Sequence, residues 1–536
     1  MLHHVNSEKL LAKLEAEMPG DSHRHRRASQ YGLQTVEPVP KFHMADEGLG
    51  EDKAYELIHN SLELDGRPHL NMASFVNTAI TPNALKLAEE NISKNLADSS
   101  EYPALMEIHQ RCVAIISHLW NTPKGCTGTG TATTGSSEAI HLGGLAMKRR
   151  WEARQKERGL DASKPNIIMG ANAQVALEKF ARYFDVEARI VPVTMESRAC
   201  LDVSKIRDYV DENTIGVFVI LGSTYTGHYE DVKGVSKVLD EYEKDTGLFV
   251  PIHVDAASGG FVAPFLHPEV EWDFRLPRVL SISTSGHKFG LAVAGVGWIV
   301  WKDKKYLPDN LVFVLKYLGG DEESYTLNFS RPGYQVIHQY YNLVALGKKG
   351  YCKYHGHSLT NARILSLFLE ATGYFDVVSD IHRKRGHEGL AHKVKEDAHK
   401  DHSYYNPGLP VVSFKFSKEF EKEYPEIPQA TIATMLRNKG YIVPNYPLPH
   451  GTEDVEVLRV VVRADMSIDL LDRFMEDLVN IVKRLIEAVD AARASHDGKV
   501  DAAQVEHIRC LLNVIMLQGG DTGEHEDAWR VHRAQC

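Results

Sequence analysis

The middle of the chain alternates short apolar runs with segments in which apolar residues recur every three or four positions. Runs rich in β-branched residues predict strands, and the periodic segments predict helices. Because the expected strands are apolar along their whole length, they are typical of a mainly parallel sheet covered by helices on both faces. The expected strands are 166–169, 188–193, 215–221, 249–254, 279–284 and 296–301, and the expected helices are 174–183, 203–212 and 232–244.

The same pattern organises the rest of the chain. We expect residues 1–60 to form an N-terminal arm and 61–345 a large domain, which also contains helices at 83–96 and 103–121. A long helical region, 333–373, leads into an expected smaller C-terminal α/β domain, 346–494, followed by a tail, 495–536. The smaller domain is expected to hold strands at 411–416, 441–443 and 457–462 and helices near 427–439 and 467–494.

Composition excludes several classes of protein. The 536 residues include 61 Lys and Arg against 72 Asp and Glu, and the net charge of −11 argues against a dedicated nucleic-acid-binding protein. No apolar run reaches the roughly 18 residues of a membrane helix, and the first residues lack the apolar region of a secretory signal. The six cysteines form no C-x-x-C pair, so a cytoplasmic, reducing location is expected.

A glycine- and threonine-rich stretch leads directly into an expected helix that starts near Ser137. It reads G-C-T-G-T-G-T-A-T-T-G-S-S-E-A from Gly125 to Ala139, and it matches neither a Walker loop nor a G-x-G-x-x-G fingerprint. Backbone N–H groups at a helix start, together with the hydroxyls of Ser136 and Ser137, form a site suited to a phosphate. The alternative is a plain loop in which Ser136 only caps the helix.

Residues that can carry chemistry follow the ends of the expected strands. Lys288 lies in S-G-H-K-F-G after 279–284, Asp255 follows 249–254, and Thr224 follows 215–221. Ligands bind at the carboxyl ends of strands in such sheets. A lysine there is suited to a Schiff base with a carbonyl cofactor, although a single loop lysine is more often just an exposed charge.

Taken together, these features indicate one cofactor. Pyridoxal phosphate needs a lysine for its aldehyde, a carboxylate for its ring nitrogen and a site for its phosphate. Lys288, thirty-three residues after Asp255, and the turn at Ser136 and Ser137 supply all three, and Gln174 opens a helix between them. The set in this order is much more specific than any one of its members.

From about Asp65 to Arg463 the chain resembles the group II pyridoxal-phosphate-dependent decarboxylases, in particular those that act on glutamate. The segments that carry the resemblance are L-N-M-A-S-F, K-N-L-A-D-S-S-E-Y-P, G-T-A-T-T-G-S-S-E-A, Q-V-A-L-E-K-F-A-R-Y-F, T-Y-T-G-H-Y-E, H-V-D-A-A-S-G-G-F, S-T-S-G-H-K-F-G, Y-L-G-G, N-F-S-R-P and L-R-V-V-V-R. The resemblance implies an α/β type I (aspartate-aminotransferase-like) fold, a homodimer or higher homo-oligomer, and decarboxylation of L-glutamate to 4-aminobutanoate.

The resemblance also assigns roles to residues. Lys288 matches the Schiff-base lysine, Asp255 the partner of the ring nitrogen, and Tyr317 a loop residue that helps to return a proton to the product. The other implied cofactor contacts are Ser136, Ser137, Gln174, Thr224, Ala257, Ser285, His287 and, from the neighbouring subunit, Ser330. The implied substrate contacts are Ser74, Phe75, Asn95, Asp98 and Arg459, with Arg463, four residues on, as a possible alternative to Arg459.

Several alternatives stay open at this level. The chain could be a pyridoxal-phosphate lyase or a decarboxylase of aspartate, cysteine sulfinate, an aromatic amino acid or a phosphorylated long-chain base, or a catalytically silent regulatory member. The segment His382 to His402 holds five histidines, and a solvated insertion is favoured over zinc because the spacings suit no standard site. An apolar helix at 502–517 is expected to fold back onto its own domain, in preference to binding calmodulin, because it has few cations.

Overall fold

The computed structural model describes residues 13, 42–97, 100–126, 128–315, 322–386, 401–494, 505, 508 and 509. Residue contacts divide the chain into two units, Met1–Asp65 and Gly66–Cys536. In the first unit, helix α3 (Glu51–Leu62) begins after Gly50 and has acidic residues in its first turn, where they complement the helix dipole. This helix lies in the expected arm and was not predicted.

The second unit contains a seven-stranded sheet. Its strand order is β1 (Thr129–Thr133), β7 (Gly297–Trp301), β6 (Val279–Ser285), β5 (Ile252–Asp255), β4 (Thr214–Ile220), β2 (Asn166–Gly170) and β3 (Glu187–Val191). The pairs from β6 to β3 are parallel, whereas β7 runs antiparallel to both β6 and β1. All residues of β2 and β4 to β7 are buried, as in a sheet covered on both faces, although β5 and β6 also contain polar residues.

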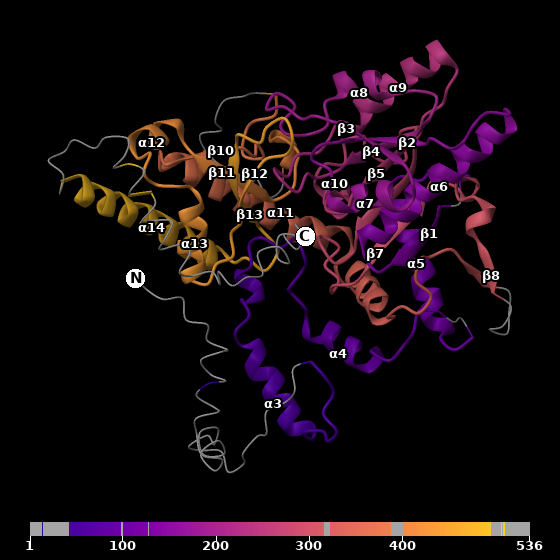
Figure 1. The fold of residues 1–536 in the computed structure, drawn as a ribbon. Coiled ribbons are helices and arrows are strands. Elements are labelled where there is room, and N and C mark those ends of the chain that lie inside the picture. Colours follow the sequence, from indigo (N-terminus) through magenta and orange to yellow (C-terminus); the bar gives the residue numbers. More distant parts are fainter. Residues whose placement is uncertain are drawn as a thin grey trace. The chain divides into compact units, whose positions relative to one another are not determined.

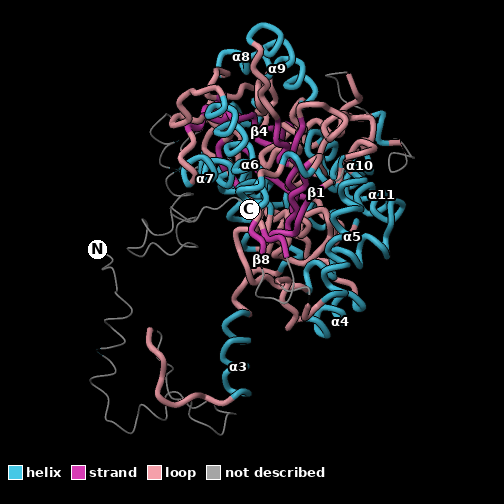
Figure 2. The backbone as a smooth tube through the Cα atoms, turned by 90° about the vertical axis from the view of Figure 1, so that its right-hand side faces the viewer, coloured by secondary structure: helices cyan, strands magenta, loops and turns pink. Residues whose placement is uncertain are grey.

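Helices cover both faces of this sheet. Alternate residues of β4 point to opposite sides: Val217 and Val219 belong to the core that includes α5 (Pro103–Leu119) and α9 (Val232–Thr246), whereas Phe218 belongs to the core beneath α6 and α7. Figure 2 shows the strands between α6 and α7 on one side and α5, α10 and α11 on the other. The bounds of the other helices here are α4 Pro82–Asn91, α6 Ser136–Glu157, α7 Val175–Tyr183, α8 Ile206–Tyr209 and α10 Ala263–Leu266.

A long helix, α11 (Tyr334–Ala371), connects this sheet to a second, smaller one (Figure 1). The helix is interrupted at Gly347, whose φ of 56° lies in the left-handed region. The second sheet is antiparallel, in the order β10 (Phe375–Val377), β11 (Val411–Phe416), β13 (Glu456–Val461) and β12 (Asn445–Pro447). The helices beside it are α12 Lys418–Glu423, α13 Ala430–Asn438 and α14 Ile468–Ala494, and a separate hairpin pairs β8 (Phe313–Leu315) with β9 (Glu322–Ser324).

Most expected elements of the second unit are present, but α10, α12 and β8 to β10 were not predicted, and other elements differ as follows. The glycine- and threonine-rich stretch contains strand β1, which was not predicted, and the helix after it has 22 residues instead of about fifteen. The strand expected at 441–443 is wrong, since β12 begins at Asn445. The helix expected at 203–212 is a 3-10 turn followed by the four-residue α8. The division into a large and a small domain remains a prediction.

The histidine-rich segment is not a purely solvated insertion at its ends. His382 is fully buried and its Nε2 lies 3.1 Å from the carboxylate of Glu370, and His402 is buried against Arg363, with 3.2 Å between their nitrogens. Residues 387–400 lie outside the described residues. The described part of the chain contains no group of three or more His, Cys, Asp and Glu that could hold a metal.

The contact between α6 and the sheet gives a test of packing. The imidazole of His253 is completely buried, with Ser281 Oγ 2.8 Å from Nδ1 and Ser283 Oγ 3.0 Å from Nε2. A Cβ on Gly143 of α6 would lie 2.4 Å from Nδ1 of His253. Because two hydrogen bonds hold this ring, it cannot move aside without losing them.

We therefore expect Gly143→Ala to lower the stability of the fold by about 1–3 kcal/mol, although glycine-to-alanine changes in helices normally stabilise by about 1 kcal/mol. The measurement compares the thermal unfolding midpoints of Gly143→Ala and the wild type. Ala153→Gly, on the exposed side of the same helix, measures helix propensity alone. A midpoint for Gly143→Ala that equals or exceeds the wild-type value would contradict the packing argument.

Candidate active site

Strand ends of the large sheet converge at one edge. β1 and β6 both run antiparallel to β7, so their carboxyl ends lie at the same edge as those of β2, β4 and β5. Asp255 and Ser285 are the last residues of β5 and β6, and Ser136 begins α6 just after β1. The Ser285 hydroxyl donates to Ser136 Oγ over 2.9 Å. Beyond the ends of the neighbouring strands β2 and β4, the amide of Gln174 donates to the Thr224 hydroxyl.

Lys288 is the central group of this edge. Lys288 is only 7% exposed to solvent, and its ammonium lies 5.4 Å from the ring centroid of Phe75. Burial raises the pKa of Asp255, while the charge of Lys288 and the backbone N–H of Ala257, 3.0 Å away, oppose that rise. Burial, and then the charge of Lys288, lowers the pKa of His287 to about 4, so this imidazole is neutral at pH 7. Lys288 and Asp255 are thus both buried and lie within electrostatic reach of each other.

The turn before α6 is suited to a phosphate. The helix begins at Ser136 after Gly135 and has no side-chain cap. A Cβ on Gly297 would lie 2.7 Å from the backbone nitrogen of Ser136, so β7 packs directly against this turn and fixes it. Ser137 lies in the same first turn. The helix N-terminus and the hydroxyls of Ser136 and Ser285 can accept an anion.

The donor set thus fits pyridoxal phosphate. Lys288 can bond to its aldehyde carbon, Asp255 can bind a protonated ring nitrogen, and the serine-lined turn can receive its phosphate. Each of the three requirements is met by a different strand end of the same edge.

The segment from 71 to 78, which includes a turn at Met72 and Ala73, forms another wall. The backbone N–H of Asn77 donates to the His287 carbonyl over 2.8 Å, and the buried ring of Phe75 packs edge-on against Phe289. The hydroxyl of Ser74 accepts from the backbone of Val76 over 3.1 Å. This segment therefore lies directly against the residues on either side of Lys288.

Two buried arginines, Arg459 and Arg463, differ in whether they keep an unused hydrogen-bond donor. Arg459 donates to the carbonyls of Thr224, over 2.9 Å, and Ala73, and its Nε has no hydrogen-bond partner among the described residues. Its guanidinium lies 5.0 Å from the ring centroid of Phe75. Arg463 instead donates to the carbonyls of Pro68, Asn71 and Ser74 and pairs with Asp465. Arg463 holds the segment in place, and Arg459 keeps a donor for a ligand.

Other predicted residues form a separate group. The Asn95 amide donates to Ser330 Oγ over 3.3 Å, and Asn95 Oδ1 accepts from the backbone of Arg331 over 2.9 Å. None of these contacts involves Lys288, Asp255 or Arg459, and Ser330 is exposed. Asp98 and Tyr317 lie outside the described residues.

Sequence reasoning missed the support of the Thr224 loop. His228 Nε2 lies 3.0 Å from Asp380 Oδ1, and its Nδ1 lies 2.8 Å from the hydroxyl of Thr226. The Ser413 hydroxyl also donates to the Tyr225 carbonyl. Residues near the smaller sheet therefore hold a loop of the larger one. His228 lies in the segment T-Y-T-G-H-Y-E and could have indicated a supporting contact. Its partner Asp380, 152 residues further along the chain, could not be identified from the sequence.

A buried acid completes this support. Glu230 accepts hydrogen bonds from the backbone N–H groups of Ile220, over 2.6 Å, and Leu201, over 3.0 Å, and from the amide of Asn172, over 2.8 Å. Burial raises its pKa, and these three donors oppose the rise. Glu230 thus ties the ends of β2 and β4 to the Thr224 loop.

The ion pair of Asp380 makes stability depend on pH. Burial alone would raise the pKa of Asp380, but His228 and Arg198 lower it from 3.8 to about 2. A carboxyl whose folded pKa lies below its unfolded value stabilises the fold above the unfolded pKa and loses that effect as the pH falls through the folded pKa. The contribution at neutral pH is about 2 kcal/mol.

We expect Asp380→Asn to lower the thermal midpoint at pH 7, and we expect the gap from the wild type to narrow as the pH falls from 4 toward 2. Thermal unfolding followed by circular dichroism at several pH values measures both. Asp376→Asn, an exposed acid of the same unit, is the control. A gap that is constant with pH would show that Asp380 acts by packing and not by charge.

Three comparisons with known proteins agree with this geometry. Residues 50–387 match the family model described as the pyridoxal-dependent decarboxylase conserved domain. A glutamate decarboxylase of Saccharomyces cerevisiae is 50% identical over 488 residues, which cover 88% of this chain and 82% of the yeast protein. A glutamate decarboxylase of Solanum lycopersicum is 45% identical over 460 residues, 85% of each chain.

Solved structures confirm the expected type I fold. A glutamate decarboxylase of Lactobacillus brevis superposes with a TM-score of 0.75 at 38% identity, covering 83% of this chain and 95% of that one. A rice structure titled TDC with PLP superposes with a TM-score of 0.65 at 13% identity, which shows a shared fold alone. This chain belongs to the pyridoxal-dependent decarboxylase family.

Proposed function

We infer that this chain removes the α-carboxylate of L-glutamate as carbon dioxide and releases 4-aminobutanoate, with pyridoxal phosphate as its cofactor. The glutamate decarboxylases described above match most of the chain at 45–50% identity. The observation that carries the inference is the position of Lys288, which lies against Phe75 and within electrostatic reach of the buried Asp255.

Each residue of the edge has a part in holding the cofactor. Bound pyridoxal phosphate supplies an aldehyde that bonds to amines and a ring that accepts the electrons left at Cα. Lys288 holds the aldehyde carbon, and Asp255 keeps a proton on the ring nitrogen, an interaction strengthened by burial. The other proposed contacts are Ser136, Ser137 and Ser285 for the phosphate, Gln174 and Ala257 for the ring faces, Thr224 for the phenolic oxygen and His287 beside the ring.

The wall of Phe75 and Arg459 is proposed to select the substrate. The free Nε–H and the charge of Arg459 suit a carboxylate, and the Ser74 hydroxyl adds a neutral hydrogen bond. The ring of Phe75 lies 5.4 Å from the Lys288 ammonium and packs edge-on against Phe289, so it forms an apolar wall beside the lysine. Glutamate, with two carboxylates, offers a partner both to this wall and to the cofactor side.

Asn95 and Ser330 are proposed to act in the site of a second subunit. Support comes from their separation from the Lys288 group and from the exposure of Ser330, which suits contact with another chain. Asp98 and Tyr317 are proposed to act with them. The active form is therefore a homodimer or a higher homo-oligomer with shared sites.

A cytoplasmic location is a further proposal. Cys112, Cys126, Cys200 and Cys352 are free thiols, which suits a reducing compartment. Among the residues that the structure describes, no helix is long and apolar enough to cross a membrane. The tail considered for calmodulin lies almost wholly outside the described residues, and calmodulin remains the less favoured partner.

A panel of amino acids tests the substrate and the lysine together. We expect carbon dioxide release from L-glutamate and little from L-aspartate, cysteine sulfinate or aromatic amino acids, and we expect Lys288→Ala to abolish turnover and the cofactor's absorption band. Lys349→Ala, which changes an exposed lysine, should behave like the wild type. Turnover retained by Lys288→Ala would rule out the central assignment, and faster release from another amino acid would change the substrate.

Mixed oligomers test the shared site. Lys288→Ala and Asn95→Ala subunits, each inactive or weak alone, are co-expressed with different tags and purified on both. If Asn95 serves its neighbour, one intact site forms per mixed pair, and the activity should reach about half of the wild-type value. If Asn95 serves its own subunit, the mixed form keeps only one weakened site and reaches about half of the activity of the Asn95→Ala parent.

A further inference from the structure

The turn that carries Lys288 contains a strained backbone. It spans residues 286–290, directly after β6. The Ala292 N–H donates to the Gly286 carbonyl over 3.1 Å, and the Leu291 N–H donates to the Lys288 carbonyl over 3.1 Å. Leu291 has a φ of 64°, in the left-handed region that residues other than glycine seldom adopt. Such a backbone persists only where its surroundings hold it in place.

Two side-chain amides of α11 hold this turn. Nε2 of Gln339 donates to the Gly290 carbonyl over 2.9 Å, and Nδ2 of Asn342 donates to the Leu291 carbonyl over 2.7 Å. Both amide residues are buried, at 0% and 6% exposure. Gly290 and Leu291 follow Lys288 by two and three residues. The two amides therefore fix the backbone directly after the lysine.

Each of these carbonyls also accepts a second side-chain donor. The Tyr351 hydroxyl donates to the Gly290 carbonyl over 2.9 Å, and the Asn77 amide donates to the Leu291 carbonyl over 2.9 Å. Burial raises the pKa of the Tyr351 phenol, so its hydroxyl keeps the proton that it donates. Tyr351 lies beyond the interruption of α11 at Gly347, so both parts of this helix contact the turn.

Gln339 also packs inside the turn. A Cβ on Gly286 would lie 2.4 Å from Oε1 of Gln339, and a Cβ on Gly290 would lie 2.9 Å from the same oxygen. The two glycines thus leave the space that this amide occupies. The indole Nε1 of Trp298 donates to Oε1 over 3.3 Å. An indole N–H can only donate, so this contact fixes which end of the amide faces the Gly290 carbonyl.

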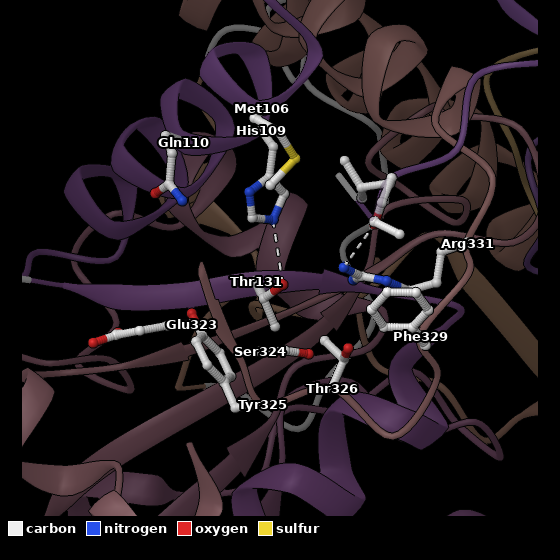
Figure 3. Close-up of a pocket in the computed structure, with 12 residues that line it drawn as sticks. Met106, His109, Gln110, Thr131, Glu323, Ser324, Tyr325, Thr326, Phe329 and Arg331 are labelled. Atoms are coloured by element: carbon white, nitrogen blue, oxygen red, sulfur yellow. Dashed lines mark hydrogen bonds between the residues drawn. The ribbon is translucent and has the colours of Figure 1, made fainter. Parts of the chain in front are cut away.

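The indole that binds this amide is held in turn by a helix on the same face of the sheet. The imidazole of His109 on α5 stacks on Trp298 with 5.8 Å between the ring centroids. Its Nε2 accepts the backbone N–H of Ala132 over 2.9 Å. Figure 3 shows this imidazole beside Thr131 of β1, in the lining of a cavity of about 320 Å³ that also includes Arg331. Contacts from α5, β1 and β7 therefore set the orientation of the indole.

We propose that Gln339 and Asn342 are positioning residues for Lys288, whose amides fix the turn so that the lysine amine lies where the aldehyde carbon of the cofactor binds. This inference rests on the function proposed above for Lys288. Neither amide belongs to the proposed cofactor or substrate contacts. A displacement of about 1 Å at a reacting group can lower a rate about a hundred-fold, so loss of either amide lowers turnover even where the fold is kept.

Two variants of the full-length holoenzyme test the proposal. Gln339→Met and Asn342→Leu replace each amide with an apolar side chain of similar size. We expect each to lower kcat for L-glutamate at least about ten-fold and to change KM by less than about two-fold, because the wall at Phe75 and Arg459 is unchanged. If one variant does not give a folded holoenzyme, the other decides.

Hydroxylamine gives a readout that does not depend on turnover. This nucleophile takes the cofactor aldehyde from Lys288, and the loss of the cofactor's absorption band measures the rate. We expect the band to disappear at least about three-fold faster in both variants than in the wild type, because a loosened turn holds the amine less firmly against the aldehyde.

Asn361→Leu is the matched control for lost stability. Asn361 also lies on α11, and its amide donates to the carbonyl of Met466 over 3.2 Å, away from the Lys288 turn. We expect this variant to lower the thermal midpoint while kcat and the rate with hydroxylamine stay at the wild-type values.

Two results would overturn the inference: kcat and hydroxylamine rates within about two-fold of the wild type in Gln339→Met and Asn342→Leu, or a change in KM alone. Lys288→Ala separates this inference from the function on which it rests. Turnover retained by Lys288→Ala would overturn the proposed function itself. Turnover abolished there, with normal kinetics in the two amide variants, would overturn only the positioning role.

Discussion

The candidate site depends on the parallel pairing of β5 with β6. Asp255 pairs with Ser283, and the hydrogen bond of 2.8 Å from the Ala256 N–H to the Ser283 carbonyl continues the pairing past the end of β5. The Ser285 N–H then donates to the Ala257 carbonyl over 3.1 Å. This register brings the turn that carries Lys288 beside the buried carboxylate. A slip of one residue would turn Asp255 to the opposite face of the sheet and separate the two charges.

The two sheets of the second unit share the walls of the site. Arg459, on β13 of the small sheet, donates to the Thr224 carbonyl in the loop after β4 of the large one, and Asp380 pairs with His228 in the same loop. These contacts hold the loop 221–230, whose residues are buried except for the half-buried Tyr225. Any relative movement of the two sheets must therefore move the position of Thr224 or break an ion pair and several hydrogen bonds.

The fold class and the cofactor chemistry could be predicted because buried strands leave a recognisable pattern of apolar residues in the sequence. β4 and β6 are apolar or small at every position, and Lys288 and Asp255 stand at strand ends, so both fold class and cofactor chemistry followed from local sequence. β1 was missed because glycine and threonine give it the composition of a loop, and it became a strand by pairing with β7. Local sequence also could not place His109 and Arg331, which are 222 residues apart, on one cavity. Arg459 and Arg463 look alike in sequence, and only their hydrogen bonds separate a residue with a spare donor from one that holds backbone.

The packing of α6 on the sheet has a consequence for how such a sequence can change. Gly143, His253, Ser281 and Ser283 fit one another by size and by hydrogen bonding: the glycine leaves room for the imidazole, and the two serines bind both of its nitrogens. Replacing the histidine with an apolar residue would leave the two buried serine hydroxyls without their hydrogen-bond partner. Replacing the glycine with a larger residue would displace the imidazole ring. We therefore expect these four positions to change together during evolution, because a substitution at one of them requires matching substitutions on one helix and two strands.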